Sequence, residues 1–172
     1  MTEPLYRLLE ELGIRYTVTE HEAAFTVEQA DPLYGHLPGA HSKNLFLRNK
    51  RGTQHYLVVV QSHRQVDIRA LKAQLGEATL SFASPERLQR YLGLTPGSVS
   101  PFGLINDHER AVRVILDKSL LDFDTLNFHP NRNTATLSLS SADFQRFLAH
   151  CGHEVRLLDF GAGNGAEPGA QP

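Results

Sequence analysis

Three polar segments interrupt apolar runs of this sequence, and each has residue types that can do chemistry. The first is residues 39–44 (GAHSKN), which leads directly into an apolar run. A lysine at the mouth of an apolar strand, here Lys43, is held by its backbone and can aim its ammonium into a cleft. The alternative is a surface lysine whose stem covers apolar residues while its amine stays in water.

The second segment, from Pro96 to Gly103, combines two glycines with small hydroxyl residues. Such a backbone can approach a ligand closely, and adjacent free N–H groups can then hold a carbonyl oxygen or a phosphate. It matches no phosphate-loop consensus, so the motif does not predict a nucleoside triphosphate site. An ordinary connection between two elements is the alternative interpretation.

The third segment is residues 127–131 (NFHPN), with His129 at its centre. A histidine here can donate a hydrogen bond or act as an acid or base near neutral pH. The alternative is a histidine at the end of a hairpin that fixes a turn.

Other catalytic patterns are not supported by the residue spacing. The chain has nine histidines, but it contains neither HExxH nor a Cys/His pair at zinc spacing, so we expect no metal. It has no GxSxG motif, which argues against a Ser-His-Asp triad. The single cysteine, Cys151, falls near the end of an amphipathic helix and is interpreted as core rather than nucleophile.

Basic residues cluster locally although the formal net charge is −2. If the hairpin predicted at 43–61 and the helix after it share a face, that face would be positive. The alternative is a solvated hairpin tip. Any binding of nucleic acid must come from such a local patch, because the bulk charge does not favour it. The basic residues concerned are Lys43, Arg48, Lys50, Arg51, Arg64, Arg69 and Lys72.

Hydrophobic periodicity and capping signals give the elements that must position these segments. The predicted helices are 4–12, a short one capped by Thr26 with Gln29, 68–75 after Asp67, one from Ser84 to Gly93, and 141–150. The predicted strands are 14–18, the hairpin 43–48 with 55–61, the pair 104–105 with 112–116, the hairpin 126–129 with 134–139, and 154–158. Their mixed order predicts an α+β domain around a mixed sheet.

Length and composition predict one globular domain over residues 1–160. Hydrophobic residues make up 41% and charged residues 21% of the 172. No apolar run reaches the length of about 20 residues that a membrane span needs, and the N-terminus lacks the pattern of a signal peptide. One cysteine fits a reducing cytoplasm. Residues 161–172 carry no large apolar side chain, so we expect a disordered tail.

Several segments taken together resemble a known family. They are HSKNLFLRNKRG (41–52), LGLTPGSVSPFGLIND (92–107) and NFHPNRNTATLSLS (127–140), supported by HYLVVV, LSFAS and VRVILDKSLL. In this order they are similar to the YbaK/ProX family of trans-editing proteins, and most similar to its free-standing prolyl-tRNA editing branch that removes alanine. The similarity runs from Leu5 to Phe160. It implies a single YbaK-like domain with a mostly antiparallel, barrel-like sheet and flanking helices.

The resemblance also implies an activity. The protein would hydrolyse the ester of mischarged tRNA(Pro), foremost Ala-tRNA(Pro), using a water assisted by a ribose hydroxyl of the tRNA and no cofactor. The alternatives are a deacylase for another amino acid, such as Cys-tRNA(Pro), a non-catalytic module that binds tRNA or a synthetase, and a hydrolase of another small ester. The implied partner is the acceptor end of tRNA(Pro), with prolyl-tRNA synthetase as a further candidate and neither DNA nor membrane.

Residue roles follow from the same resemblance. It assigns catalysis to Lys43, Gly97 and His129, and substrate binding to Asn44, Ser98, Val99 and Phe128. Basic residues of the first hairpin would contact tRNA, here Arg48, Lys50 and Arg51. Phe46, Leu47 and Phe128 are candidates for setting the size of the pocket, with ordinary core positions as the alternative.

Overall fold

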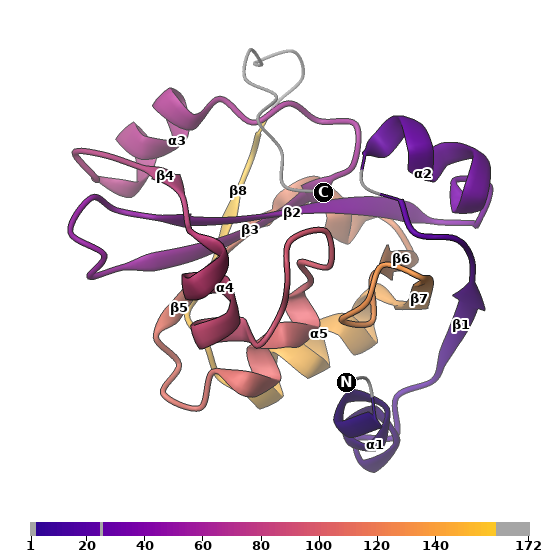
Figure 1. Cartoon of the computed structure of the whole chain (residues 1–172). Helices are drawn as coiled ribbons and strands as arrows, with labels where there is room; N and C mark the ends of the chain where they lie inside the picture. The colour runs from indigo at the N-terminus through magenta and orange to yellow at the C-terminus, as the bar shows by residue number, and fades with distance from the viewer. Residues whose placement is uncertain (1–2, 25, 161–172) are drawn as a thin grey trace.

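The computed structural model describes residues 3–24 and 26–160 (Figure 1). The helices are α1 (Glu3–Glu11), α2 (Val27–Tyr34), α3 (Ile68–Leu75), α4 (Pro85–Leu92) and α5 (Ser141–Cys151), with 3-10 helices η1 (Pro101–Asn106) and η2 (Lys118–Asp122). The strands are β1 (Tyr16–Glu20), β2 (Ala40–Arg48), β3 (His55–Gln61), β4 (Ser81–Phe82), β5 (Val112–Asp117), β6 (Thr125–Phe128), β7 (Ala135–Ser140) and β8 (Val155–Leu158). The tail expected over residues 161–172 lies outside the described residues.

The strands form one mixed sheet in the order β1-β7-β6-β2-β3-β5-β8, and β4 pairs with β2. The pairs β1–β7, β2–β3, β2–β4 and β6–β7 are antiparallel, and β2–β6, β3–β5 and β5–β8 are parallel. The α+β class and the mostly antiparallel mixed sheet are therefore confirmed. The barrel-like form is not, because β1 and β8 end the described sheet as separate edges and leave it open.

Side-chain caps start the helices where the sequence predicts them. The hydroxyl of Thr26 accepts from the backbone N–H of Gln29 at 3.1 Å and begins α2. The carboxylate of Asp67 caps α3 in the same way, and Ser84 caps α4, which has proline at its first position. These caps satisfy N–H groups that lack partners in the first turn of a helix.

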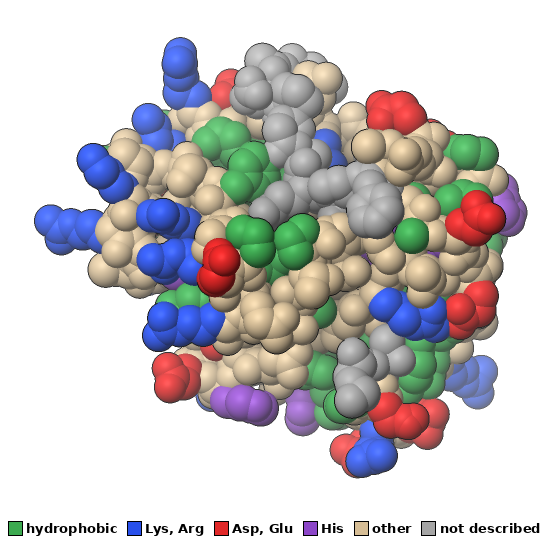
Figure 2. All heavy atoms as spheres, in the orientation of Figure 1, with side chains coloured by type: hydrophobic (Ala, Val, Ile, Leu, Met, Phe, Trp, Pro, Cys, Tyr) green, Lys and Arg blue, Asp and Glu red, His purple; other side chains and the backbone are tan. Residues whose placement is uncertain are grey.

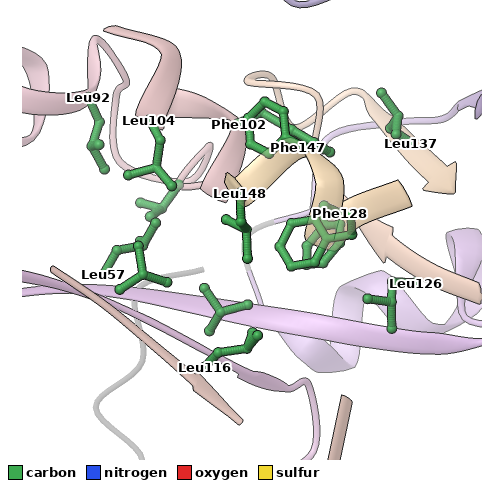
Figure 3. Packing of buried hydrophobic residues seen from close by; sticks show 14 of the residues in the cluster. Leu57, Leu92, Phe102, Leu104, Leu116, Leu126, Phe128, Leu137, Phe147 and Leu148 are labelled. Carbon is green, nitrogen blue, oxygen red and sulfur yellow. The ribbon is translucent and has the colours of Figure 1, made fainter. Parts of the chain in front are cut away.

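The core lies on both faces of the β2–β3 pair. Leu57 and Val59 of β3 face one apolar cluster, with side chains of α1, α4 and α5, while Val58 and Val60 face a second cluster under α3. Every residue of β3 except Gln61 is buried, as its continuous apolar run predicts. Figure 3 shows the first cluster, in which the Phe102 ring meets both the Phe128 and the Phe147 ring edge-on.

One predicted strand pair is wrong. Leu104 and Ile105 lie in η1 rather than in a strand, because Ser100 caps Phe102 and Pro101 starts a helical turn there. β5 pairs in parallel with β3 instead, from His55–Val112 to Val59–Leu116. The two-residue strand β4 and the turn η2 were not predicted, since neither is long enough to show a hydrophobic period.

None of the helices in residues 3–24 and 26–160 has the length and apolar composition that crossing a bilayer requires.

The single cysteine, Cys151, is half-buried at the end of α5, and burial raises the pKa of its thiol to about 11. A thiol with this pKa is protonated at neutral pH and is a poor nucleophile.

Candidate active site

A cavity of about 360 Å³ opens where β2 and β6 stop pairing. The two strands pair only at Ala40–Leu126 and His41–Asn127 before they separate. Farther along, the same edge of β2 pairs with β4 through Leu47 and Arg48. Residues 42–44, in the stretch of β2 between these pairings, line the cavity, and α2 and residues 62–65 form further parts of its wall.

The inner end of the cavity is held by close backbone approach and by side-chain hydrogen bonds. Gly39 has a φ of +97°, and a Cβ built there would lie 2.3 Å from the carbonyl oxygen of Thr125, so only glycine lets β2 approach β6. The amide of Asn127 donates to the carbonyl oxygens of Pro38 and Ala40. Ser42 Oγ donates to the carbonyl oxygen of Asn127 at 2.9 Å. The first and third polar segments are thereby joined.

Lys43 reaches into this cavity from β2 and is half-buried. Its Nζ donates a hydrogen bond to the backbone carbonyl of Arg64, in the segment that follows β3. Burial lowers the pKa of the amine from its ordinary 10.5, and the nearby Glu28 carboxylate opposes this shift. Lysine side chains ordinarily carry a positive charge at neutral pH, so Lys43 can place a cation in the cavity.

His129 lines the cavity opposite, just after β6. Its Nε2 lies 3.2 Å from the hydroxyl of Tyr34 on α2, and its backbone carbonyl accepts from Ser100 Oγ at 2.6 Å. Burial, with the nearby His21, lowers the pKa of His129 to about 4, and burial raises the pKa of Tyr34 to about 12. Both groups are therefore uncharged at neutral pH, and His129 acts there as a hydrogen-bonding group rather than as an efficient general base.

Two apolar side chains and a buried amide also line the cavity. Val99 and Phe128 line the cavity and belong to the main core cluster. Asn44 is 5% exposed, and its Oδ1 accepts no hydrogen bond from the described residues. A buried amide oxygen without a partner costs free energy, so a ligand that donates to it would gain a favourable contact.

Charged side chains stand at the outer edge of the cavity. Glu28 and Asp31 lie exposed on α2, and Asp31 Oδ1 is 3.8 Å from Nε2 of His63.

No group of three or more His, Cys, Asp or Glu side chains within residues 3–24 and 26–160 is arranged to hold a metal ion.

The structure brings together five of the site residues suggested by the sequence: Lys43, Asn44, Val99, Phe128 and His129. Gly97 and Ser98 precede Val99 in a buried turn, where Gly97 has a φ of +90°, but neither lines the cavity. Their catalytic and binding roles stay predictions. Phe46 and Leu47 lie in the two core clusters, away from the cavity.

Arg48, Lys50 and Arg51 lie at the far end of the β2–β3 hairpin. Five residues of strand separate Arg48 from Lys43, about 17 Å at the usual rise. Figure 2 shows Lys and Arg side chains gathered on the side of the molecule where Figure 1 places this hairpin end, α3 and α4. Their role in binding tRNA stays a prediction.

Several residues that shape the site have no recognisable signal in the sequence. Tyr34 is the last residue of a short helix, and nothing in its neighbours marks it as a partner of His129. His21 stacks on Tyr34 with ring centroids 4.2 Å apart, while its Nε2 lies 2.8 Å from Thr136 Oγ1. These contacts join residues far apart in the chain, so only the fold reveals them.

The geometry favours one kind of chemistry. A lysine cation and a neutral imidazole face the same partly apolar cavity, which lies beside an unpartnered amide oxygen. A fixed cation stabilises negative charge that develops on a carbonyl oxygen when water attacks an ester. The site is therefore suited to the hydrolysis of a small acyl ester.

Known proteins are similar to this chain over most of its length. The family model for the aminoacyl-tRNA editing domain matches residues 21–147. The chain is 40% identical over 151 residues to the prolyl-tRNA editing protein ProX of Acetoanaerobium sticklandii, covering 88% of this chain and 92% of that protein. It is 38% identical over 160 residues to the prolyl-tRNA synthetase associated domain-containing protein 1 of Bos taurus, covering 91% and 93%.

Solved structures agree on the fold. A crystal structure described as a candidate trans-editing enzyme for prolyl-tRNA synthetase superposes with a TM-score of 0.69 at 22% identity, covering 93% of this chain and 97% of the other. Together with the fold, the family model and the 40% identical relative define a class, the aminoacyl-tRNA hydrolases. The chain belongs to the aminoacyl-tRNA editing domain family.

Proposed function

We propose that the cavity hydrolyses the ester between an amino acid and the 3′-terminal ribose of mischarged tRNA(Pro), with Ala-tRNA(Pro) as the preferred substrate. The observation that carries this proposal is the meeting of Lys43 and His129 across one cavity in a chain of the editing family. The chain is similar over most of its length to a prolyl-tRNA editing protein, which supports tRNA(Pro) as the carrier. We propose the cytoplasm as the place where it acts.

The reaction needs little from the protein beyond binding and charge stabilisation. The oxygen of a water attacks the ester carbonyl carbon, the bond from that carbon to the ribose oxygen breaks, and the ribose oxygen takes up a proton. The Lys43 ammonium would stabilise the charge on the carbonyl oxygen, and the neutral His129 would hold the water or the ester by a hydrogen bond. Because a pKa of about 4 makes His129 a weak base, a ribose hydroxyl of the tRNA would assist the water.

Asn44 would help to fix the amino acid. Its unpartnered Oδ1 can accept from the α-amino group, which an aminoacyl ester always carries. Val99 and Phe128 are core residues that cannot easily move, so they would limit the size of the side chain that enters.

Alanine is the amino acid for which such a site is most needed. A synthetase pocket built for proline rejects a smaller side chain by only about 1–3 kcal/mol. A second site that admits alanine and excludes the larger proline ring removes the resulting error. The hairpin cations Arg48, Lys50 and Arg51 would then contact the tRNA backbone, while prolyl-tRNA synthetase is a further candidate partner.

A deacylation panel tests the proposal. Purified protein is incubated with labelled Ala-tRNA(Pro), Cys-tRNA(Pro) and Pro-tRNA(Pro), and release of the amino acid is followed. We expect rapid loss of alanine and no loss of proline. Faster loss of cysteine than of alanine would make cysteine the preferred amino acid. Hydrolysis of none of the three would overturn the proposal.

A further inference from the structure

The acceptor of the Lys43 ammonium belongs to a turn that needs support from elsewhere. Lys43 Nζ donates to the backbone carbonyl of Arg64. The backbone N–H of Arg64 donates to the carbonyl of Gln61 at 3.0 Å, which closes a four-residue turn at the end of β3. Such surface turns are among the more mobile parts of a fold, so the position of the carbonyl depends on what fixes the turn.

The Arg64 side chain ties this turn to the end of β5. Its Nε lies 2.7 Å from Oδ2 of Asp117, and its Nη2 donates to Ser119 Oγ at 3.0 Å. Asp117 is fully buried, whereas 21% of the Arg64 side chain is exposed. A buried carboxylate that faces a cation in this way holds its partner in a defined position, because an unpaired charge there is costly.

The Asp117 carboxylate has all its acceptor positions engaged. Oδ2 also accepts from the backbone N–H of Gln61 at 3.1 Å, and Oδ1 accepts from the N–H and the hydroxyl of Ser119 at 3.0 and 2.7 Å. Ser119 Oγ in turn accepts from the Gln61 side chain at 2.7 Å. The end of β3, its turn and η2 therefore form one connected polar network.

Asp117 does not line the cavity, so its influence on the site must pass through Arg64. We propose that Asp117 and Arg64 are positioning residues, which hold the Lys43 ammonium in place through the carbonyl of Arg64. The catalytic consequence rests on the proposed function. A displacement of about 1 Å in a positioned group can cost about 100-fold in rate, so we expect a loss of about 10- to 100-fold when this network is broken.

Two measurements on the whole protein test the proposal. The first follows the NMR signal of the Lys43 side chain through a pH titration without any substrate. In Asp117→Asn, we expect this pKa to fall by about one unit, because the charged amine loses a fixed hydrogen-bond acceptor. The second is steady-state deacylation of Ala-tRNA(Pro), for which we expect kcat to fall and KM to stay within about twofold.

Arg64→Lys is the milder variant if Asp117→Asn does not fold. It keeps a positive charge toward Asp117 but loses the second contact with Ser119, and its partly exposed site tolerates the change. We expect the Lys43 titration to move in the same direction by a smaller amount.

Asp107→Asn is the matched control. Asp107 is also a buried carboxylate, lies just before β5, accepts from the Val112 N–H at 2.9 Å and faces Nε2 of His153 at 3.0 Å. It should lower stability while leaving the Lys43 titration unchanged. An unchanged Lys43 titration in folded Asp117→Asn or Arg64→Lys overturns the positioning role. If the native protein hydrolyses no aminoacyl-tRNA, the proposed function fails, while the titration still decides the role of the network.

Discussion

The hydroxyl of Tyr34 lies 3.2 Å from Nε2 of His129, and the two rings meet nearly edge-on, with an angle of 74° between their planes. One comes from α2 and the other from the end of β6, so this contact joins two walls of the cavity. Burial keeps both groups uncharged, since it raises the pKa of Tyr34 to about 12 and lowers the pKa of His129 to about 4. The contact therefore orients His129 without giving it charge.

Tyr34→Phe should reduce catalysis without emptying the cavity. The ring and its stacking on His21 remain, but His129 loses the hydroxyl that orients it. We expect kcat for Ala-tRNA(Pro) to fall about 10-fold with little change in KM, within the range typical of a positioned hydrogen-bonding group. Tyr16→Phe is the control, since the Tyr16 hydroxyl donates a hydrogen bond to Glu10, away from the cavity. Equal rates in Tyr34→Phe and the native protein would mean that His129 needs no orientation from α2.

Lys43→Ala should be the most damaging single change at the site. It removes the cation that, in the proposed reaction, would face the ester carbonyl, and loss of one such stabilising group typically costs about 100- to 1,000-fold in kcat. Lys43→Arg keeps the charge, but a planar guanidinium cannot replace a compact ammonium on the Arg64 carbonyl, so we expect only partial recovery. Single-turnover deacylation of both variants gives the comparison. Full activity in Lys43→Ala would mean that the cavity does not use this cation.

Local patterns explain why much of the fold could be predicted from the sequence. The caps at Thr26, Asp67 and Ser84 and the buried run of β3 are signals within a few residues. The apolar pair Leu104–Ile105 is too short to show a hydrophobic period, so its pattern does not distinguish a strand from a helical turn. The Ser100 cap decides its conformation.

The site could be predicted only in part, for the same physical reason. Lys43 and His129 can be recognised in the sequence because each is a polar residue that interrupts an apolar run. Their position on the same cavity, however, depends on the two-residue pairing of β2 with β6. The ion pair of Arg64 with Asp117 joins residues on different elements, and neither has a local signature. Contacts of this kind follow from the order of strands in the sheet, which periodicity does not determine.

Buried neutral histidines should make the protein sensitive to mild acid. Burial lowers the pKa of His129 to about 4, and burial together with Arg87, Arg48 and Arg90 lowers the pKa of His55 to about 4. The unfolded chain, with ordinary values near 6.5, binds about one more proton at each histidine between pH 6.5 and 4. The free energy of unfolding should therefore be fully maintained above pH 6.5 and fall as the pH drops toward 4.

Urea unfolding at pH 7, 5.5 and 4.5 measures this loss, and His129→Asn isolates one contribution. Carboxylates also titrate in this range, so the informative quantity is the difference in acid loss between the native protein and the variant. We expect a smaller loss in His129→Asn, even though its stability at pH 7 is lower. An identical dependence on pH in the two proteins would show that His129 is not held neutral by burial.

The basic surface at the far end of β2 should bind the duplex part of the substrate. Arg48, Arg87 and Arg90 all lie close enough to His55 to lower its pKa, and Lys50 and Arg51 extend the surface along the hairpin end. No ion pair joins any of these five cations to a carboxylate of the described residues. In a chain of net charge −2, this unpaired positive charge suits an RNA backbone.

Substrates of different length distinguish binding at this surface from catalysis in the cavity. The double variant Arg87→Ala/Arg90→Ala should raise KM about 10-fold for Ala-tRNA(Pro) and for an aminoacylated acceptor-stem minihelix, with a weaker dependence on salt. Hydrolysis of a short aminoacylated CCA oligonucleotide should not change. This substrate has no duplex part, so it cannot reach the basic surface, which begins about 17 Å from Lys43 along β2. Arg7→Ala/Arg15→Ala, at exposed positions beside α1, controls for the loss of two charges. A similar effect of both double variants on the minihelix would assign the change to net charge rather than to this surface.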